Sequence, residues 1–74
     1  MKLYLIHIGF YEPKLLEGIY EQHGNILIAA KNTKDAKNKI KKKKIYIDKK
    51  MHIDGILEIN TVDGYKINLE KNNK

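Results

Sequence analysis

The chain has no cysteine, no arginine and no serine among its 74 residues. Without cysteine, neither a disulfide nor a thiolate metal site can stabilise so small a core. Serine and cysteine are also the commonest catalytic nucleophiles, and neither the GxxxxGK phosphate-binding pattern nor GxGxxG occurs. The sequence therefore does not favour an enzyme, and the interpretation that we prefer includes no cofactor and no bound metal.

Long apolar runs are missing too. None approaches the roughly 20 residues that span a bilayer, and the apolar residues 3–10 contain His7 and no signal-peptide cleavage site. A chain of this length has room for one domain and one modest core. We expect a cytoplasmic protein without membrane contact, with a single domain over residues 1–70 and a frayed tail over 71–74.

Every basic residue is a lysine, and the net charge is +6. Ten lysines stand within residues 31–50 against two aspartates, a net charge of +8 for this segment. Such a segment can bind phosphates without sequence specificity, but a solvated helix face, or the lysine-rich usage of an AT-rich genome, explains it equally. The candidate nucleic-acid-binding residues are Lys34, Lys37, Lys41, Lys42, Lys43 and Lys44.

Two segments are apolar at both odd and even positions, a pattern typical of strands that are buried on both faces. They are residues 3–10 (LYLIHIGF) and 25–30 (NILIAA), and we place the first centrally in a sheet. Between them, Pro13 suits the first turn of another element. Its apolar residues, at roughly helical spacing, are Leu15, Leu16 and Ile19.

A helix is predicted over residues 33–43. Asn32 or Thr33 can cap it, and Asp35 stands in the first turn, where the helix dipole favours a carboxylate. Lysines crowd its last turn, where the dipole favours cations. Residues 45–47 (IYI) are predicted to form a short edge strand.

Apolar and polar residues alternate in two later runs, 53–59 and 65–69, which predicts a hairpin with one solvent-facing side. A two-residue loop at 63–64 would place the two apolar sets on opposite faces. A three-residue loop over 62–64, with a left-handed glycine, places them on the same face, and we predict this register. The expected pairs are Ile59 with Ile67 and Leu57 with Leu69.

Together these elements predict an α+β fold. We expect a small antiparallel or mixed sheet of four or five strands, in the order strand, strand, helix, strand, strand, with the helix on one face and a C-terminal β-hairpin. One short helix cannot cover both faces of a sheet whose first two strands are apolar on both sides. Because two-fold homodimers are the commonest soluble oligomers, we expect a second copy of the chain to cover the other face.

The three histidines titrate near neutral pH in their ordinary state, so acid–base chemistry would use them. His7 stands within an apolar strand and is expected in the core or an interface. Two pairs are more suggestive, Glu21 with His23 and His52 with Asp54, because residues two apart on a strand point to the same side. If their strands were neighbours, these four residues could converge as a ligand, metal or acid–base site. Salt bridges on a wet sheet face explain the same pairs, and no HExxH-type spacing supports a metal.

The segments YEQHG, KMHIDGILEIN and TVDGYKI, in this order, resemble a small bacterial family known as domain of unknown function 1543, over residues 2–68. The residues that match the family pattern are Glu21, His23, His52, Asp54, Asp63, Gly64 and Tyr65. The chain departs from it at Gly24, where an acidic residue is usual, and at residues 55–56, where an aromatic residue is usual. The second departure argues against an aromatic-lined ligand site. The resemblance implies a fold and a bacterial context, and no established activity.

The interpretation that we favour is a non-enzymatic binding or assembly module, acting as a homodimer and contacting a protein partner. The first alternative is nonspecific nucleic-acid binding through the lysine-rich helix. The second is a small metal-dependent or acid–base enzyme that uses His23, His52 and Asp54.

Overall fold

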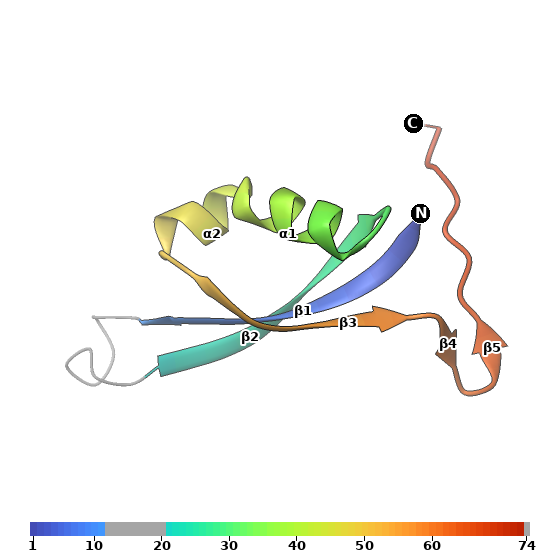
Figure 1. The fold of residues 1–74 in the computed structure, drawn as a ribbon, viewed down its shortest axis with the longest axis horizontal. Helices are drawn as coiled ribbons and strands as arrows, with labels where there is room; N and C mark the ends of the chain where they lie inside the picture. The colour runs from blue at the N-terminus through green and yellow to red at the C-terminus, as the bar shows by residue number, and fades with distance from the viewer. Residues whose placement is uncertain (12–20, 74) are drawn as a thin grey trace.

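The computed structural model describes residues 1–11 and 21–73. It is a small α+β fold in which two short helices cover one face of an antiparallel sheet, and a separate hairpin follows (Figure 1). The sheet contains β1 (Lys2–Tyr11), β2 (Glu21–Ala30) and β3 (His52–Ile59). The helices are α1 (Thr33–Lys41) and α2 (Lys44–Asp48), and the hairpin pairs β4 (Thr61–Val62) with β5 (Tyr65–Lys66).

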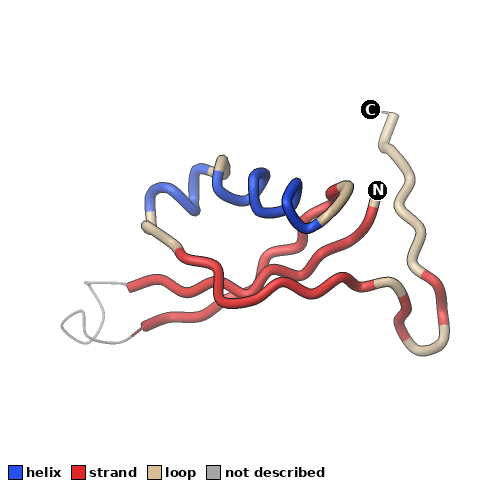
Figure 2. Tube along the Cα trace, viewed as in Figure 1, coloured by secondary structure: helices blue, strands red, loops and turns tan. Residues whose placement is uncertain are grey.

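β1 is the central strand, as its two-sided apolar pattern predicted, and the strand order is β2-β1-β3. It is antiparallel to both neighbours, pairing with β2 from Lys2 to Tyr11 and with β3 from Leu3 to Gly9. Consequently β2 and β3 run parallel to each other on either side of β1. The two helices form the connection between them, as the tube in Figure 2 shows.

The core lies between the helices and the even-numbered residues of β1. Tyr4, Ile6 and Ile8 are buried there. The remaining buried residues are Ile28, Ala30, Ala36, Ile40 and Met51. The odd-numbered residues of β1 and their cross-strand partners lie on the opposite side, which no helix of the described residues covers (Figure 1). We call this side the open face.

Since no helix of the described residues covers the open face, only one face of the second strand is covered within the single chain, and burial of its other face by a second copy stays a prediction. β2 is an edge strand, and its Leu27 is 59% exposed. It also begins at Glu21 rather than at Asn25, since its ladder with β1 continues through the polar residues up to Tyr11.

The start of α1 is fixed by two reciprocal hydrogen bonds. The Asp35 backbone N–H donates to Asn32 Oδ1 (2.8 Å), and the Lys31 backbone N–H donates to Asp35 Oδ2 (2.9 Å). The first satisfies a backbone N–H of the first turn that has no partner within the helix, and the second ties the residue before the N-cap to the first turn. The bond from Lys31 is the main reason that the pKa of Asp35 lies below its usual value. The helix ends at Lys41, near the predicted end at residue 43.

The edge strand predicted at residues 45–47 is wrong, because this segment belongs to α2. The helical turn directs Tyr46 against the core while Ile45 and Ile47 remain exposed. The Met51 backbone N–H then donates to the Tyr46 carbonyl oxygen (3.0 Å), which leads the chain into β3. Tertiary contacts thus override the strand preference of three β-branched and aromatic residues.

The predicted hairpin register is also wrong. The loop has two residues, Asp63 and Gly64, both with positive φ (53° and 82°), as a type I′ turn requires. The pairs are Thr61 with Lys66 and Val62 with Tyr65. Our argument assumed that the strand containing Ile59 continues into the hairpin, but Ile59 pairs with Leu3 of β1 instead. The hairpin is therefore a separate two-stranded sheet, and the main sheet has three strands rather than four or five.

The structure does not test two of the predictions. The element predicted after Pro13, with Leu15, Leu16 and Ile19, lies outside the described residues. The domain limit at residue 70 stays a prediction. None of the helices in the described part of the chain is long and apolar enough to cross a membrane.

Replacing Asn32 by alanine should lower the free energy of unfolding by about 1 kcal/mol, because the cap of α1 is lost. Urea denaturation followed by circular dichroism measures the change. Asn38→Ala is the matched control, since Asn38 is exposed within α1 and alanine is the better helix former. Equal stability of Asn32→Ala and the unsubstituted protein would contradict the role of this cap.

Candidate metal centre on the open face

The four residues singled out by the sequence meet in space, although their strands are not neighbours. Glu21 and His23 lie on β2, and His52 and Asp54 lie on β3, with β1 between them. Two strands separated by a third are about 10 Å apart. Yet His52 Nε2 lies 2.6 Å from Glu21 Oε1, and His23 Nδ1 lies 3.2 Å from Asp54 Oδ2. The side chains of the outer strands therefore touch across the central strand.

Gly9 makes this contact possible. It pairs with His23 on one side and with His52 on the other, at the centre of the cluster. A Cβ at this position would lie 2.6 Å from His52 Nε2 and 2.8 Å from Asp54 Oδ2, and would also collide with Glu21 Oε1. Since real Cβ atoms do not approach other atoms so closely, any larger residue would push the cluster apart.

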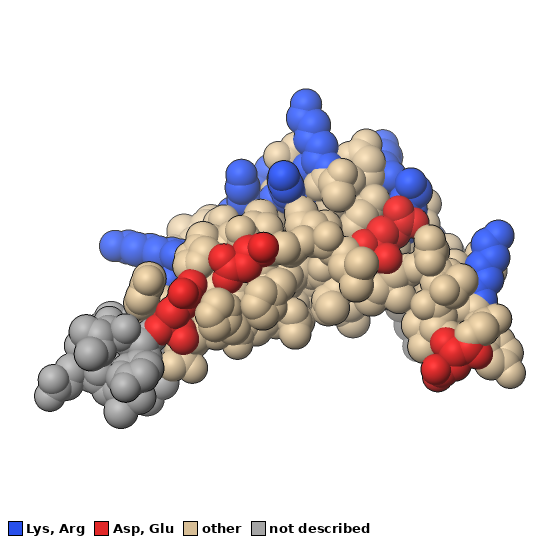
Figure 3. Space-filling model, turned by 60° about the horizontal axis from the view of Figure 1, so that its bottom comes forward, with Lys and Arg blue, Asp and Glu red and all other residues tan. Residues whose placement is uncertain are grey.

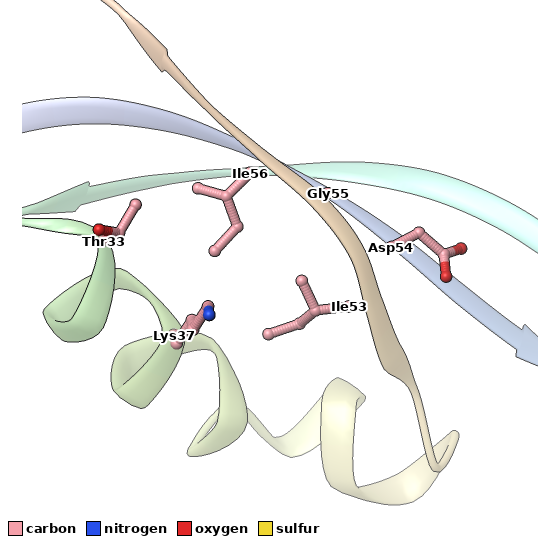
Figure 4. Close-up of a pocket in the computed structure, with 6 residues that line it drawn as sticks. All are labelled: Thr33, Lys37, Ile53, Asp54, Gly55 and Ile56. Carbon is pink, nitrogen blue, oxygen red and sulfur yellow. The ribbon is translucent and has the colours of Figure 1, made fainter.

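A β-bulge in β3 places Asp54 on the open face. His7 pairs with Gly55 and Ile8 pairs with Ile53, so Asp54 is the extra residue. Figure 4 shows the result: Ile53 points towards α1, whereas the Asp54 carboxylate points away from it. The bulge lets His52 and Asp54 share the open face.

The bulge also changes the face of the residues that follow it. Strict alternation would keep Ile53, Leu57 and Ile59 on one side. Instead, Ile53 packs against the core, while Leu57 and Ile59 pair with open-face residues of β1. A shallow pocket between α1 and β3 lies behind the cluster and shares Asp54 with it (Figure 4). Its lining residues are Thr33, Lys37, Ile53, Asp54, Gly55 and Ile56.

His7 completes the cluster and is not in the core, one of the two positions that we expected for it; the other, an interface, stays a prediction. Its odd position in β1 turns it to the open face, where its ring stacks on that of His23 with centroids 5.1 Å apart and planes 4° from parallel. His7 Nδ1 lies 3.0 Å from Asn25 Oδ1. Because this oxygen only accepts hydrogen bonds, the contact needs a proton on Nδ1, and in a neutral imidazole this leaves the lone pair on Nε2. Metal-binding histidines show this arrangement, with the second nitrogen donating to an oxygen.

The potential ligand atoms form two groups that share one residue. Those of His7, His23 and Asp54 lie within 4.8 Å of one another, and so do those of Glu21, His52 and Asp54. Imidazole nitrogens and carboxylate oxygens are the ligands that zinc, nickel and cobalt ions accept. The side chains remain partly accessible, with 31–47% exposure for the four members on the outer strands.

The electrostatics of the cluster favour a cation. Glu21 and Asp54 bring two negative charges together, and no lysine lies among the described open-face residues of the three strands. His23 has a carboxylate oxygen near each ring nitrogen, Asp54 at 3.2 Å and Glu21 at 3.8 Å. A neutral imidazole has only one N–H, so its second nitrogen faces a carboxylate without a proton between them. A metal ion or an added proton would satisfy both groups.

One known family model matches the chain. The profile described as Domain of Unknown Function (DUF1543) matches residues 18–69, more than two thirds of the sequence. The chain belongs to this family. Neither the curated proteins nor the solved structures give a match. Within the DUF1543 domain, the matched range includes the cluster members of β2 and β3, whereas His7 and Gly9 precede it.

The lysine-rich segment of the DUF1543 domain lies on the helix side of the sheet, opposite the open face. The six candidates for nucleic-acid binding stand on α1, on α2 and between them, and all are exposed. Figure 3 shows lysines mainly along the helix side, with carboxylates on the surface turned forward. Lys39 of α1 is engaged locally, since its Nζ donates to the Ala29 carbonyl oxygen (2.8 Å) and lies 3.6 Å from Asp35. Nucleic-acid binding stays a prediction.

The sequence analysis did not predict that Gly9 and His7 belong to the cluster. The sequence does contain an indication of the role of Gly9, because it is the one small residue among the large apolar residues of the first strand. It also stands two positions from His7, and therefore on the same face. The register that brings β2 and β3 to either side of it is a tertiary property.

Gly9→Ala should separate the cluster while leaving the sheet folded, because the new Cβ displaces His52 and Asp54, which are solvent-accessible. Nuclear magnetic resonance spectra of the imidazole rings should show large shifts for His23 and His52. Gly24→Ala is the control, since its Cβ would lie 3.5 Å from Ile8 Cδ1, an ordinary contact. Unchanged imidazole resonances in Gly9→Ala would refute the close approach.

Proposed function

We propose that the DUF1543 domain binds a divalent transition-metal ion on the open face of its sheet. One observation carries the proposal: all three histidines and two carboxylates converge from three strands over Gly9, with ligand atoms in groups no wider than 4.8 Å. The members of this metal centre are His7, Glu21, His23, His52 and Asp54.

Stabilisation of the fold is a weaker explanation for the cluster. Exposed ion pairs contribute about 0–1 kcal/mol each, and the carboxylates are about one-third exposed. Ion pairing also gives no account of His7, which contacts Asn25 Oδ1 through Nδ1 and belongs to the ligand group with His23 and Asp54. Metal binding accounts for the presence of His7, and it also accounts for the carboxylates on either side of His23.

The ligand set favours borderline metals such as Zn²⁺, Co²⁺ and Ni²⁺. Mg²⁺ and Ca²⁺ prefer oxygen ligands alone, whereas three of the five ligands here are imidazoles. Soft ions such as Cu⁺ prefer sulfur, and the chain has no cysteine. The accessible side chains leave coordination positions for water or a small ligand.

Zn²⁺ should bind the purified protein in isothermal titration calorimetry, and His52→Ala should weaken the affinity by at least about tenfold, since loss of an outer-shell partner alone costs 10- to 100-fold. Glu58→Gln is the matched control. It removes a carboxylate from the same strand, but Glu58 pairs with Tyr4 on the helix side and lies 3.8 Å from Lys2 Nζ. The absence of Zn²⁺ binding, or equal affinity in His52→Ala, would exclude the proposed site.

Assembly is a second function that we propose, and a different observation supports it. Leu27, Leu5 and Leu57 form a row across all three strands on the open face, because Leu5 pairs with both of the others. Leu27 is 59% exposed and Leu57 is 60% exposed. Leu3 and Ile59 extend this apolar row towards one end of the sheet.

A second copy of the same chain fits this surface. The described open-face residues of the sheet include no lysine, whereas ten lysines of the chain belong to residues 31–50 on the helix side. Two copies that meet through their open faces therefore keep their lysine-rich surfaces apart. A two-fold axis near the apolar row would place leucines against leucines, since such interfaces use the same patch twice.

Sedimentation velocity at micromolar concentration should give the mass of a dimer, and Leu57→Lys should give a monomer because it places a charge within the apolar row. Ile47→Lys is the control, since Ile47 on α2 is also 60% exposed but lies on the helix side. A monomeric mass for the unsubstituted protein would rule out this assembly.

A further inference from the structure

We infer that the metal centre holds two ions, bridged by the carboxylate of Asp54. This inference rests on the proposed metal-binding function and specifies the number and arrangement of the ions. It depends on which carboxylate oxygen faces which histidine nitrogen.

The two oxygens of Asp54 face different histidines. Oδ2 lies 3.2 Å from His23 Nδ1, and Oδ1 lies 3.2 Å from His52 Nε2. His23 belongs to β2 and His52 to β3, so Asp54 spans the gap above Gly9. A carboxylate whose oxygens are directed to two separate nitrogen ligands has the geometry of a bridge rather than that of a ligand to one ion.

Glu21 belongs to one ligand group only. Its Oε1 lies 2.6 Å from His52 Nε2, whereas its Oε2 lies 3.8 Å from His23 Nε2, the ring nitrogen that Asp54 does not face. Because an imidazole binds one ion through one nitrogen, Glu21 is a ligand on the His52 side. Asp54 is therefore the carboxylate that the two ligand groups share.

A single ion does not use this ligand set. The members divide into a side with His7 and His23, whose rings are stacked and parallel, and a side with His52. Metal–nitrogen bonds are about 2.0–2.1 Å long, so one ion cannot bind histidines on both sides while Asp54 keeps its two oxygens directed apart. Two ions about 3.5–4 Å apart, the spacing usual for paired metal sites, match the division.

The charges leave room for an anion. Two divalent ions bring four positive charges against the two carboxylates, and the histidines are neutral when they bind metals. Each ion has few protein ligands on a partly accessible face. The remaining positions suit water, hydroxide or a small oxyanion lying between the ions.

Equilibrium dialysis of the full-length protein against Co²⁺, with elemental analysis, tests the inference. We expect two ions per chain, and magnetic susceptibility should show coupling between them. His7→Ala removes a ligand from one group only and His52→Ala removes one from the other, so each should bind one ion without magnetic coupling. Glu58→Gln, which leaves both groups intact, should still bind two.

The outcomes separate the inference from the proposed function. Two coupled ions support both. One ion per chain in the unsubstituted protein overturns the bridged pair and leaves metal binding in place, and no bound ion overturns both. Two uncoupled ions contradict the shared carboxylate of Asp54, and two ions retained in His7→Ala contradict the assignment of His7 to one of the ions. Because stoichiometry and coupling are measured on the unsubstituted protein, the test does not depend on the folding of any variant.

Discussion

The two ladders of β1 determine which residues of the sheet form the core and which lie on the open face. Because β1 is antiparallel to both neighbours, its even-numbered residues face the helices and its odd-numbered residues face the opposite side, together with their partners on β2 and β3. The first set forms the core with α1. The second set carries the leucine row at one end and the histidines at the other. Because side chains alternate along β1, the residues that form the core and the residues that form the proposed sites lie on opposite sides of the sheet.

Within that arrangement, two local irregularities bring together the residues of the proposed metal centre. Gly9 removes a side chain from the central strand, so residues of the outer strands meet above it. The bulge at Asp54 adds a residue to β3 and directs the carboxylate to the same face as His52. A regular sheet would keep these side chains about 10 Å apart, the distance between next-nearest strands. Bulges and strand glycines commonly mark places where a sheet is adapted to a close approach.

Local signals in the sequence were sufficient for some of these features. The cap at Asn32, the helix that follows and the central place of β1 were all predictable, because each depends on residues close together in the chain. The two-residue period of strands also predicted that Glu21 and His23 share a face, and that His52 and Asp54 share a face. The bulge, the end of β3 at Ile59 and the helical state of residues 45–47 depend on partners far along the chain. The residue patterns of these segments are those of regular strands, so the sequence alone did not reveal the differences.

The two surfaces proposed on the open face adjoin each other along β1. Leu5, at the centre of the apolar row, and His7, a member of the proposed metal centre, are two residues apart on the same face, or about 7 Å at the usual rise of a strand. Additive effects are usual only for substitutions separated by more than about 7–10 Å. A second copy placed on the leucine row would therefore lie beside His7. The two proposed functions would then influence each other, because both use neighbouring residues of one face of β1.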